Sequence, residues 1–205
     1  MNLKDFPVGS NTDFAPMDAG TYNAVCIGLV DIGTQTLDYA GETSQRGQMI
    51  ILFEFPEETI DIDGNTMPRN LSLKCSKSNN AKSTLRKTLT AWRGKDFTPE
   101  ELGDFHLSRL LGVPATVAVA HREHAGKTYA FVASVTKPMK SNKFTASRKV
   151  YFDLHAPETF HDVDKLPKWI IDTINKSQEA IEGGIAFKQS KQQTDDVIGE
   201  DNTTF

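Results

Sequence analysis

The chain has 205 residues, of which 38% are hydrophobic and 24% are charged, and its formal net charge is −4. This length predicts one domain with extensions, large enough to bury a core without disulfide or metal support. Cys26 and Cys75 are isolated and form no CxxC pair, which argues against a zinc cluster or a redox motif. The polar N-terminus is not typical of a signal peptide and no apolar run has the length of a membrane span, so we expect a reducing, cytoplasmic setting.

The charges are unevenly distributed along the chain. Residues 1–68 have a net charge of −9, residues 69–149 a net charge of +11, and residues 150–205 a net charge of −6. The stretch 69–95 contains eight Lys or Arg residues and no acidic residue. Charge separation of this kind favours a polyanionic partner, although a solvated helix face also produces basic runs.

The first part of the chain predicts an arm, a strand and a loop. Residues 1–19 are polar, include two prolines and predict an irregular arm. The apolar, β-branched run 20–32 predicts the first strand. Residues 33–47 are polar and predict a loop that carries one aromatic residue, Tyr39.

Two further strands follow. Residues 48–55 are apolar on both faces for part of their length, which predicts a central strand. The Asp-Gly-Asn sequence at 63–65 predicts a hairpin turn. In the third strand, residues 69–76, Lys74 lies on the outward face. The opposite, core-facing side consists of Leu71, Leu73 and Cys75.

A helix comes next, with Asn79 or Asn80 as its expected N-cap and Gly94 at its end. Its apolar stripe, spaced i, i+4 and i+7, consists of Leu85, Leu89 and Trp92. The stripe predicts that Trp92 belongs to the core.

The capping sequence Thr98-Pro99-Glu100-Glu101 predicts a second, short helix. Residues 113–121 and 127–136 predict the fourth and fifth strands, joined by a tight connection.

The C-terminal part begins with a second basic segment, residues 137–152, which contains three aromatic residues. A last helix is expected over residues 168–182, ended by a Gly-Gly pair. Its expected apolar positions are Ile170, Ile171, Ile174 and Ile181. The polar composition from residue 188 onward predicts a disordered tail.

Three strands, a helix and a closing pair of strands follow the order of the OB-fold, a five-stranded Greek-key barrel. We therefore predict a mainly β protein with accessory helices; an α+β sandwich is the alternative. The expected arm, barrel domain, helical extension and acidic tail are residues 1–19, 20–152, 153–187 and 188–205.

The chain resembles bacteriophage single-stranded DNA-binding proteins of the OB-fold type. The resemblance lies in four segments: GTYNAV, LSLKCSKSNNAKSTLRKTLTAWRGKDFTPEEL, LLGVPATVAVAH and the acidic C-terminus DDVIGEDNTTF. It covers most of residues 20–136 and the last eleven. The tail lacks the Pro-Phe ending of the bacterial relatives. The resemblance implies a sequence-tolerant single-stranded DNA-binding protein that acts in phage replication, recombination or repair, in the cytoplasm of the infected host.

Single-strand binders combine cations that follow the phosphates with flat side chains on which bases stack. In an OB barrel the groove usually crosses strands two and three. The predicted DNA-contacting residues are Arg69, Lys74, Lys77, Lys82, Arg86, Lys140 and Lys143, with Tyr39, Phe53 and Phe144 for stacking. Phe53 and Phe55 can instead lie in the core, which we expect for at least one of them.

The acidic tail predicts a second function. Its predicted partner-binding residues are Asp195, Asp196, Glu200, Asp201 and Phe205. We expect this tethered polyanion to compete with DNA for the basic groove, and Phe205 to bind a replication or recombination protein when DNA releases the tail. A tail that only aids solubility is the alternative. The sequence leaves self-association open.

No phosphate loop, nucleophile elbow or HExxH motif is present, so we predict a non-enzymatic protein without a cofactor or metal. Two other functions remain open. One is a phage adaptor whose basic face binds an acidic protein. The other is a metal-dependent nuclease that uses carboxylates such as Glu54, Asp61 and Asp63.

Overall fold

A computed structural model describes residues 15–39, 41–62 and 64–188. The side chain of Tyr39 lies outside this description, as do most of the predicted N-terminal arm and nearly all of the predicted acidic tail.

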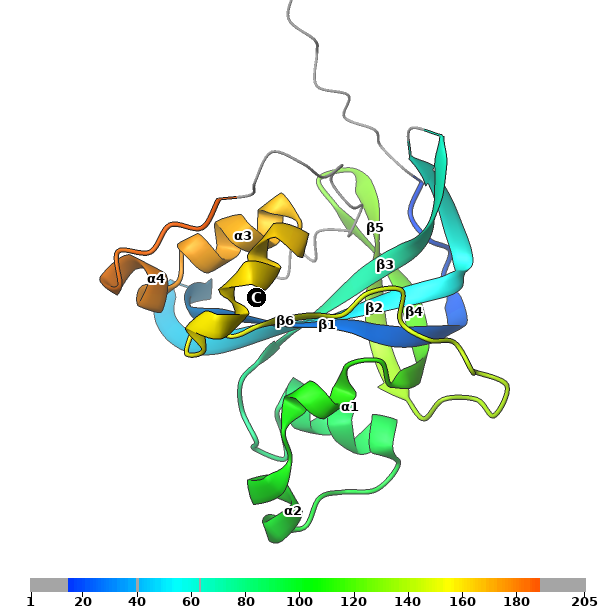
Figure 1. Ribbon diagram of the computed structural model, residues 1–205, viewed down its shortest axis with the longest axis horizontal. Coiled ribbons are helices and arrows are strands. Elements are labelled where there is room, and N and C mark those ends of the chain that lie inside the picture. Colours follow the sequence, from blue (N-terminus) through cyan, green and yellow to red (C-terminus); the bar gives the residue numbers. More distant parts are fainter. Residues whose placement is uncertain (1–14, 40, 63, 189–205) are drawn as a thin grey trace, which may run out of the picture.

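In this part of the chain the strands form one sheet. They are β1 (Gly20–Tyr39), β2 (Glu42–Ile62), β3 (Asn65–Ser76), β4 (Pro114–His124), β5 (Lys127–Thr136) and β6 (Val150–Phe152). The main order is β3-β2-β1-β4-β5 with antiparallel neighbours, and β6 pairs with β1 in parallel. The two outer strands, β3 and β5, lie side by side and nearly close the sheet into a barrel (Figure 1). This arrangement confirms the predicted five-stranded OB-fold barrel.

The hairpin that joins β1 to β2 is longer than the sequence predicts. Residues 33–47, expected to form a loop, continue the ladder as far as the pair Tyr39 and Glu42. The prediction was wrong because cross-strand pairing and tertiary packing outweigh a polar composition. The predicted turn at 63–65 is confirmed, since Ile62 pairs with Asn65 across it.

One core fills the barrel interior, and α1 (Thr84–Arg93) covers one end of the barrel (Figure 1). Trp92 is 4% exposed, and its ring centroid lies 5.4 Å from that of Phe53. The predicted apolar stripe of α1 is therefore confirmed. The helix begins later than expected, because the Ser83 side chain, not an asparagine, accepts the capping hydrogen bond from the Arg86 backbone.

The other helices of the cap are α2 (Pro99–Asp104) and the 3-10 helix η2 (Leu107–Leu110). The predicted capping box is present: the Thr98 hydroxyl accepts from the Glu101 backbone, and the Glu101 carboxylate accepts from the Thr98 backbone. Gly94 ends α1 with φ +76°, a conformation that favours glycine.

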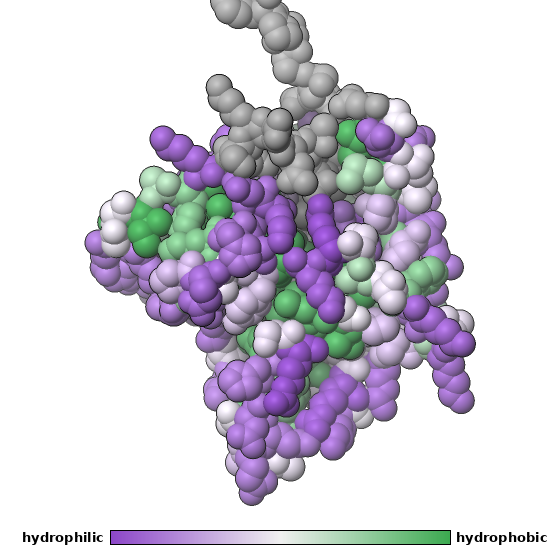
Figure 2. Space-filling model, viewed as in Figure 1, coloured by the Kyte–Doolittle hydropathy of each residue, from purple (hydrophilic) through white to green (hydrophobic). Residues whose placement is uncertain are grey.

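The C-terminal extension consists of η3 (Pro157–Lys165), α3 (Lys168–Asn175) and α4 (Gln178–Glu182). The single helix predicted over 168–182 is broken, because the Ser177 hydroxyl caps a new helix by accepting from the Ala180 backbone. The break leaves Ile181 68% exposed, so its predicted place on the apolar face is corrected. Figure 2 shows apolar surface at the end of the molecule formed by this extension.

A second core joins the extension to the outer face of β1 and β2. The buried side chains Ile170, Ile171 and Ile174 of α3 belong to one cluster with Val25 and Ile27 of β1. Glu179 of α4 accepts hydrogen bonds from both the backbone and the hydroxyl of Thr34, at 2.7 and 2.8 Å. The β1–β2 ribbon is therefore buried on both faces.

Close packing at Gly33 fixes the extension against β1. Gly33 has φ +70°, and a Cβ at this position would lie 2.5 Å from the Ser177 Cβ. Both the backbone conformation and the close contact require glycine here.

The core position of Phe53 gives a stability prediction. We expect Phe53→Ala to lower the free energy of unfolding by about 3–5 kcal/mol, because it removes a fully buried aromatic ring and leaves a cavity. Urea denaturation measures the loss. The exposed-site control Lys82→Ala should stay within about 0.5 kcal/mol of the wild type. A Phe53 variant as stable as this control would contradict the core assignment.

Candidate nucleic-acid interface

The outer face of β2 and β3, where the sequence predicts the DNA groove, is largely covered. Ile50 and Leu52 of β2 are buried in the second core. Glu54 is 3% exposed, and its carboxylate accepts hydrogen bonds from the backbone and the hydroxyl of Ser147. The outward-facing β3 side chains Asn70 and Ser72 are also buried. This face is therefore not an open groove over its whole length.

Two predicted DNA contacts are corrected. Phe53 has no exposed surface and faces the barrel interior, so it cannot stack on a base in this structure. Arg86 is buried, with its guanidinium 2.7 Å from the Asp96 carboxylate and 3.0 Å from the Phe97 carbonyl oxygen. The hydrogen bond from Arg86 is the largest cause of the lowered pKa of Asp96. Arg86 thus connects α1 to the segment before α2.

Three other predicted contacts lie beside the covered face. Lys74 is half-buried on β3. Lys77 is exposed, but its ammonium group lies 2.8 Å from the carboxylate of Asp31, which compensates its charge. Arg69 donates a hydrogen bond to the carbonyl oxygen of Ala15 at 2.8 Å. Their contact with DNA stays a prediction.

The second basic segment is fixed to the barrel by Asn142. This side chain is buried and donates hydrogen bonds to the carbonyl oxygens of Ala24 and Ala115, at 3.1 and 3.0 Å. The predicted contacts Lys140 and Lys143 lie on either side of it and are exposed. The anchor therefore holds the backbone around Asn142 beside the β1–β4 seam.

Of the remaining predicted contacts, Lys82 and Phe144 are accessible at the surface. Lys82 is exposed just before α1, and Phe144 is half-buried. Tyr39 lies at the tip of the long β1–β2 hairpin, not in a loop, and its side chain is outside the described part. The predicted tail residues 195–205 are also outside it.

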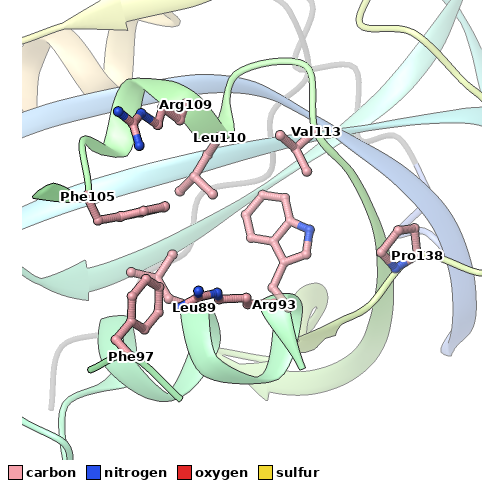
Figure 3. Close-up of a pocket in the computed structure, with 9 residues that line it drawn as sticks. Leu89, Arg93, Phe97, Phe105, Arg109, Leu110, Val113 and Pro138 are labelled. Carbon is pink, nitrogen blue, oxygen red and sulfur yellow. The ribbon is translucent and has the colours of Figure 1, made fainter. Parts of the chain in front are cut away.

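A pocket that the sequence did not indicate lies in the helical cap (Figure 3). This cap pocket has a volume of about 250 Å³ and is lined by Leu89, Trp92, Arg93, Phe97, Phe105, Arg109, Leu110, Val113 and Pro138. In Figure 3, Leu110 and Val113 face Leu89 and Arg93 across the pocket. The lining residues come from α1 and η2, from the segments directly before and after α2, and from the segments just before β4 and just after β5.

Cations from both basic segments meet around the cap pocket. The side chain of Lys137 packs against Gly94 at the end of α1, and the side chain of Lys149 packs against Gly112, beside the pocket residue Val113. Both lysines are exposed, as is Arg109. The sequence marked both segments as basic, but nothing local in it indicated that they converge.

One carboxylate balances part of this charge. Glu101 forms an ion pair with Arg93 and lies 3.4 Å from the Lys95 ammonium group. The Arg93 hydrogen bond, followed by that of the Thr98 backbone, lowers the pKa of Glu101 to about 2. The Arg93 guanidinium also lies 4.6 Å from the Phe97 ring centroid, a cation–π contact. Glu101 therefore holds the pocket wall in place.

The residues considered for catalysis are not assembled in the described ranges. Glu54 is buried, whereas Asp61 is exposed and accepts a hydrogen bond from the Thr66 hydroxyl. Asp63 is outside the described part. Within that part, no group of three or more His, Cys, Asp or Glu side chains is placed to hold a metal ion.

Neither thiol is accessible for chemistry. Burial raises the pKa of both Cys26 and Cys75 to about 12, so both remain protonated and unreactive. Among the described residues, no helix has the length and apolar character needed to cross a membrane.

Comparison with known proteins adds no family assignment: no family model matches the chain, and no curated protein matches it.

The lowered pKa of Glu101 predicts a pH dependence of stability. The folded pKa is below the usual value of 4.5, so this carboxylate stabilises the fold fully above about pH 4.5 and loses its contribution as the pH falls toward 2. Glu101→Gln should therefore lower the melting temperature at neutral pH, and the difference from wild type should shrink through that window. Thermal melts followed by circular dichroism test this.

The exposed carboxylate Glu123 offers a matched control, since Glu123→Gln removes the same charge from the β4–β5 hairpin. The account of the capping network fails if both variants show the same pH profile.

Proposed function

We propose that this protein binds single-stranded DNA without strong sequence preference and acts in bacteriophage replication, recombination or repair, in the cytoplasm of the infected bacterium. The OB-fold barrel is one support, because this fold provides surfaces for oligonucleotides in many proteins. Fold alone does not establish a function, so the proposal depends on the surface chemistry.

The observation that carries the proposal is a set of exposed cations that have no acidic partner among the described residues. The set consists of Lys82, Lys87, Arg109, Lys137, Lys140, Lys143 and Lys149. All belong to the region with a net charge of +11 in an otherwise acidic chain. Cations that face solvent without intramolecular pairing are suited to phosphates, because binding then breaks no ion pair.

The proposed path of the strand differs from the one expected from sequence. Since the C-terminal extension covers much of the outer face of β2, we place the phosphates along α1 and the Asn142-anchored segment. Lys74, Lys77 and Arg69 lie at its edge, and the half-buried Phe144 is the stacking candidate within it. Tyr39 remains a candidate at the hairpin tip.

We propose that the acidic tail regulates this binding and recruits replication or recombination proteins. Asp195, Asp196, Glu200 and Asp201 form a polyanion that follows the last cation of the chain, Lys191. Tethered to the same molecule, it competes with DNA at a high effective concentration.

The binding itself is tested by mobility shifts with oligo(dT), oligo(dA) and duplex DNA at two salt concentrations. We expect similar affinities for the two single strands and weaker binding to the duplex. The logarithm of affinity should fall with the logarithm of salt by about 0.7 for each phosphate contacted. Equal affinity for duplex, or no dependence on salt, would contradict the proposal and favour the adaptor alternative.

The position of the interface is tested by Lys140→Ala with Lys143→Ala. The double variant should remain folded, bind all single strands more weakly, and show a salt slope reduced by about 1.4 for two lost contacts. The control is Lys168→Ala with Lys176→Ala, two exposed lysines of the C-terminal extension. If the control pair loses as much affinity as the test pair, the interface lies elsewhere.

A further inference from the structure

The inner surface of the cap pocket is apolar and partly aromatic. The Phe97 and Phe105 rings form an edge-to-face pair at one end of the pocket, with centroids 5.1 Å apart, and Pro138 lies at the other end (Figure 3). Trp92 also lines the pocket, and its indole N–H already donates to the Pro114 carbonyl oxygen at 2.8 Å. The walls therefore suit a flat ring better than a group that needs several hydrogen bonds inside the pocket.

The size of the pocket suits one nucleobase. An engineered cavity of about 150 Å³ binds benzene, and the volume of the cap pocket is about 250 Å³. A nucleobase is larger than benzene, so the pocket has room for one base and not for a stack of two. Arg109 and Pro138 are exposed lining residues and mark the open side of the pocket. A base between the apolar walls can keep its polar edge at this side, in contact with water or with the Arg109 guanidinium.

Cations lie on more than one side of the pocket. Arg109 belongs to the lining itself. Lys137 packs against Gly94 at the end of α1, and Lys149 packs against Gly112 just before β4. All three cations are exposed, and none has a carboxylate partner in the described part of the chain. A base within a strand has a phosphate on each side, so this arrangement matches a nucleotide better than a lone aromatic side chain of a protein.

The pocket lies where the two stretches of the proposed DNA path meet. One part of its wall belongs to α1, through Leu89, and another to the start of the second basic segment, through Pro138. The next residue, Met139, is 44% exposed and lies between Lys137 and Lys140 in the sequence. Apolar surface therefore continues from the pocket toward the cations of residues 137–149. A strand that follows both stretches passes the mouth of the pocket.

We propose that one base of the bound strand leaves the stack and inserts into the cap pocket, with its flanking phosphates among Arg109, Lys137 and Lys149. This inference rests on the proposed single-strand binding and adds a base-binding site to it. Contact of one base with aromatic side chains changes affinity by roughly fivefold to more than a hundredfold. Every base has a flat face, so the site requires no particular sequence.

Photocrosslinking locates the inserted base directly. Iododeoxyuridine, whose iodine takes the place of the thymine methyl group, replaces the thymidines of an oligo(dT). The complex with the full-length protein is irradiated, which joins iodouracil to aromatic side chains in contact with it, and mass spectrometry identifies the modified residue. We expect the main crosslink at Trp92, Phe97 or Phe105. Crosslinks at Phe144 alone would place the bound base outside the pocket and overturn the proposal.

A variant with a filled pocket gives an independent measurement. Val113→Phe adds a ring to the pocket wall, so a base no longer fits. This variant should bind oligo(dT) about tenfold more weakly, with an unchanged salt slope because no cation is lost. The control Val113→Ala keeps the pocket open at the same position and should bind nearly as tightly as the wild type. Circular dichroism checks that both variants are folded, and the wild-type crosslinks decide the question if Val113→Phe does not fold.

The outcomes separate this inference from the proposed function. Base insertion is wrong if Val113→Phe binds oligo(dT) as tightly as the wild type and the crosslinks lie outside the pocket. Single-strand binding then stands, and the pocket is left to an aromatic side chain of a partner protein. A loss of affinity in Val113→Phe that comes with a smaller salt slope would indicate displaced cations and would also count against insertion. If the wild type does not bind oligo(dT), both the insertion and the proposed function are wrong.

Discussion

The packing of α3 against the outside of the β1–β2 ribbon is the interaction on which the rest of the structure depends. Closing a barrel requires only that the inner faces of its strands form a core. Here Ile170 and Ile174 bury the outer face as well, so the central strands are apolar on both sides. Two cores on opposite faces of one ribbon explain why the sequence of β2 does not alternate. They also explain why the extension belongs to the barrel and does not form a separate unit.

This packing limits which surface is open to the DNA strand that we propose. With the outer face of β2 covered, the exposed cations lie along α1 and along residues 137–149. Three hydrogen-bonded anchors hold that segment: the Met139 backbone to Thr116, Asn142 to two carbonyl oxygens, and Ser147 to Glu54. The Glu54 anchor ties a buried carboxylate to the basic segment, which gives that carboxylate a structural role in place of the metal-ligand role considered from sequence.

Local signals in the sequence predicted much of the fold. The bounds of β5, the capping box of α2, the glycine at the end of α1 and the core position of Trp92 all follow from short-range patterns, and the structure confirms them. What the sequence did not predict depends on distant partners. The base of the 33–47 hairpin is hydrogen-bonded through Thr34 to Glu179 of α4, and the buried Arg86 is paired with Asp96, ten residues later. The sequence also could not show whether the Phe53 side chain faces the barrel interior or its outer surface, because β2 is apolar on both faces.

For the candidate site as well, local patterns predicted some features, whereas others depend on residues far apart in the sequence. Charge counting found the two basic segments, but the residues that join them, Asn142, Lys137 and Lys149, have no distinguishing local pattern. The cap pocket was equally hidden, because its nine lining residues come from five stretches of sequence. Which side chains share a surface or a pocket depends on the tertiary fold, which brings these residues together from separate parts of the sequence.

We propose that single-stranded DNA follows the surface formed by α1 and residues 137–149 and avoids the face covered by the C-terminal extension. Hydrogen–deuterium exchange with and without oligo(dT) tests this claim directly. The account predicts that DNA slows exchange in residues 77–95 and 137–149 and leaves α3 unchanged. Protection of α3, or faster exchange there because DNA displaces the extension from β2, would contradict it.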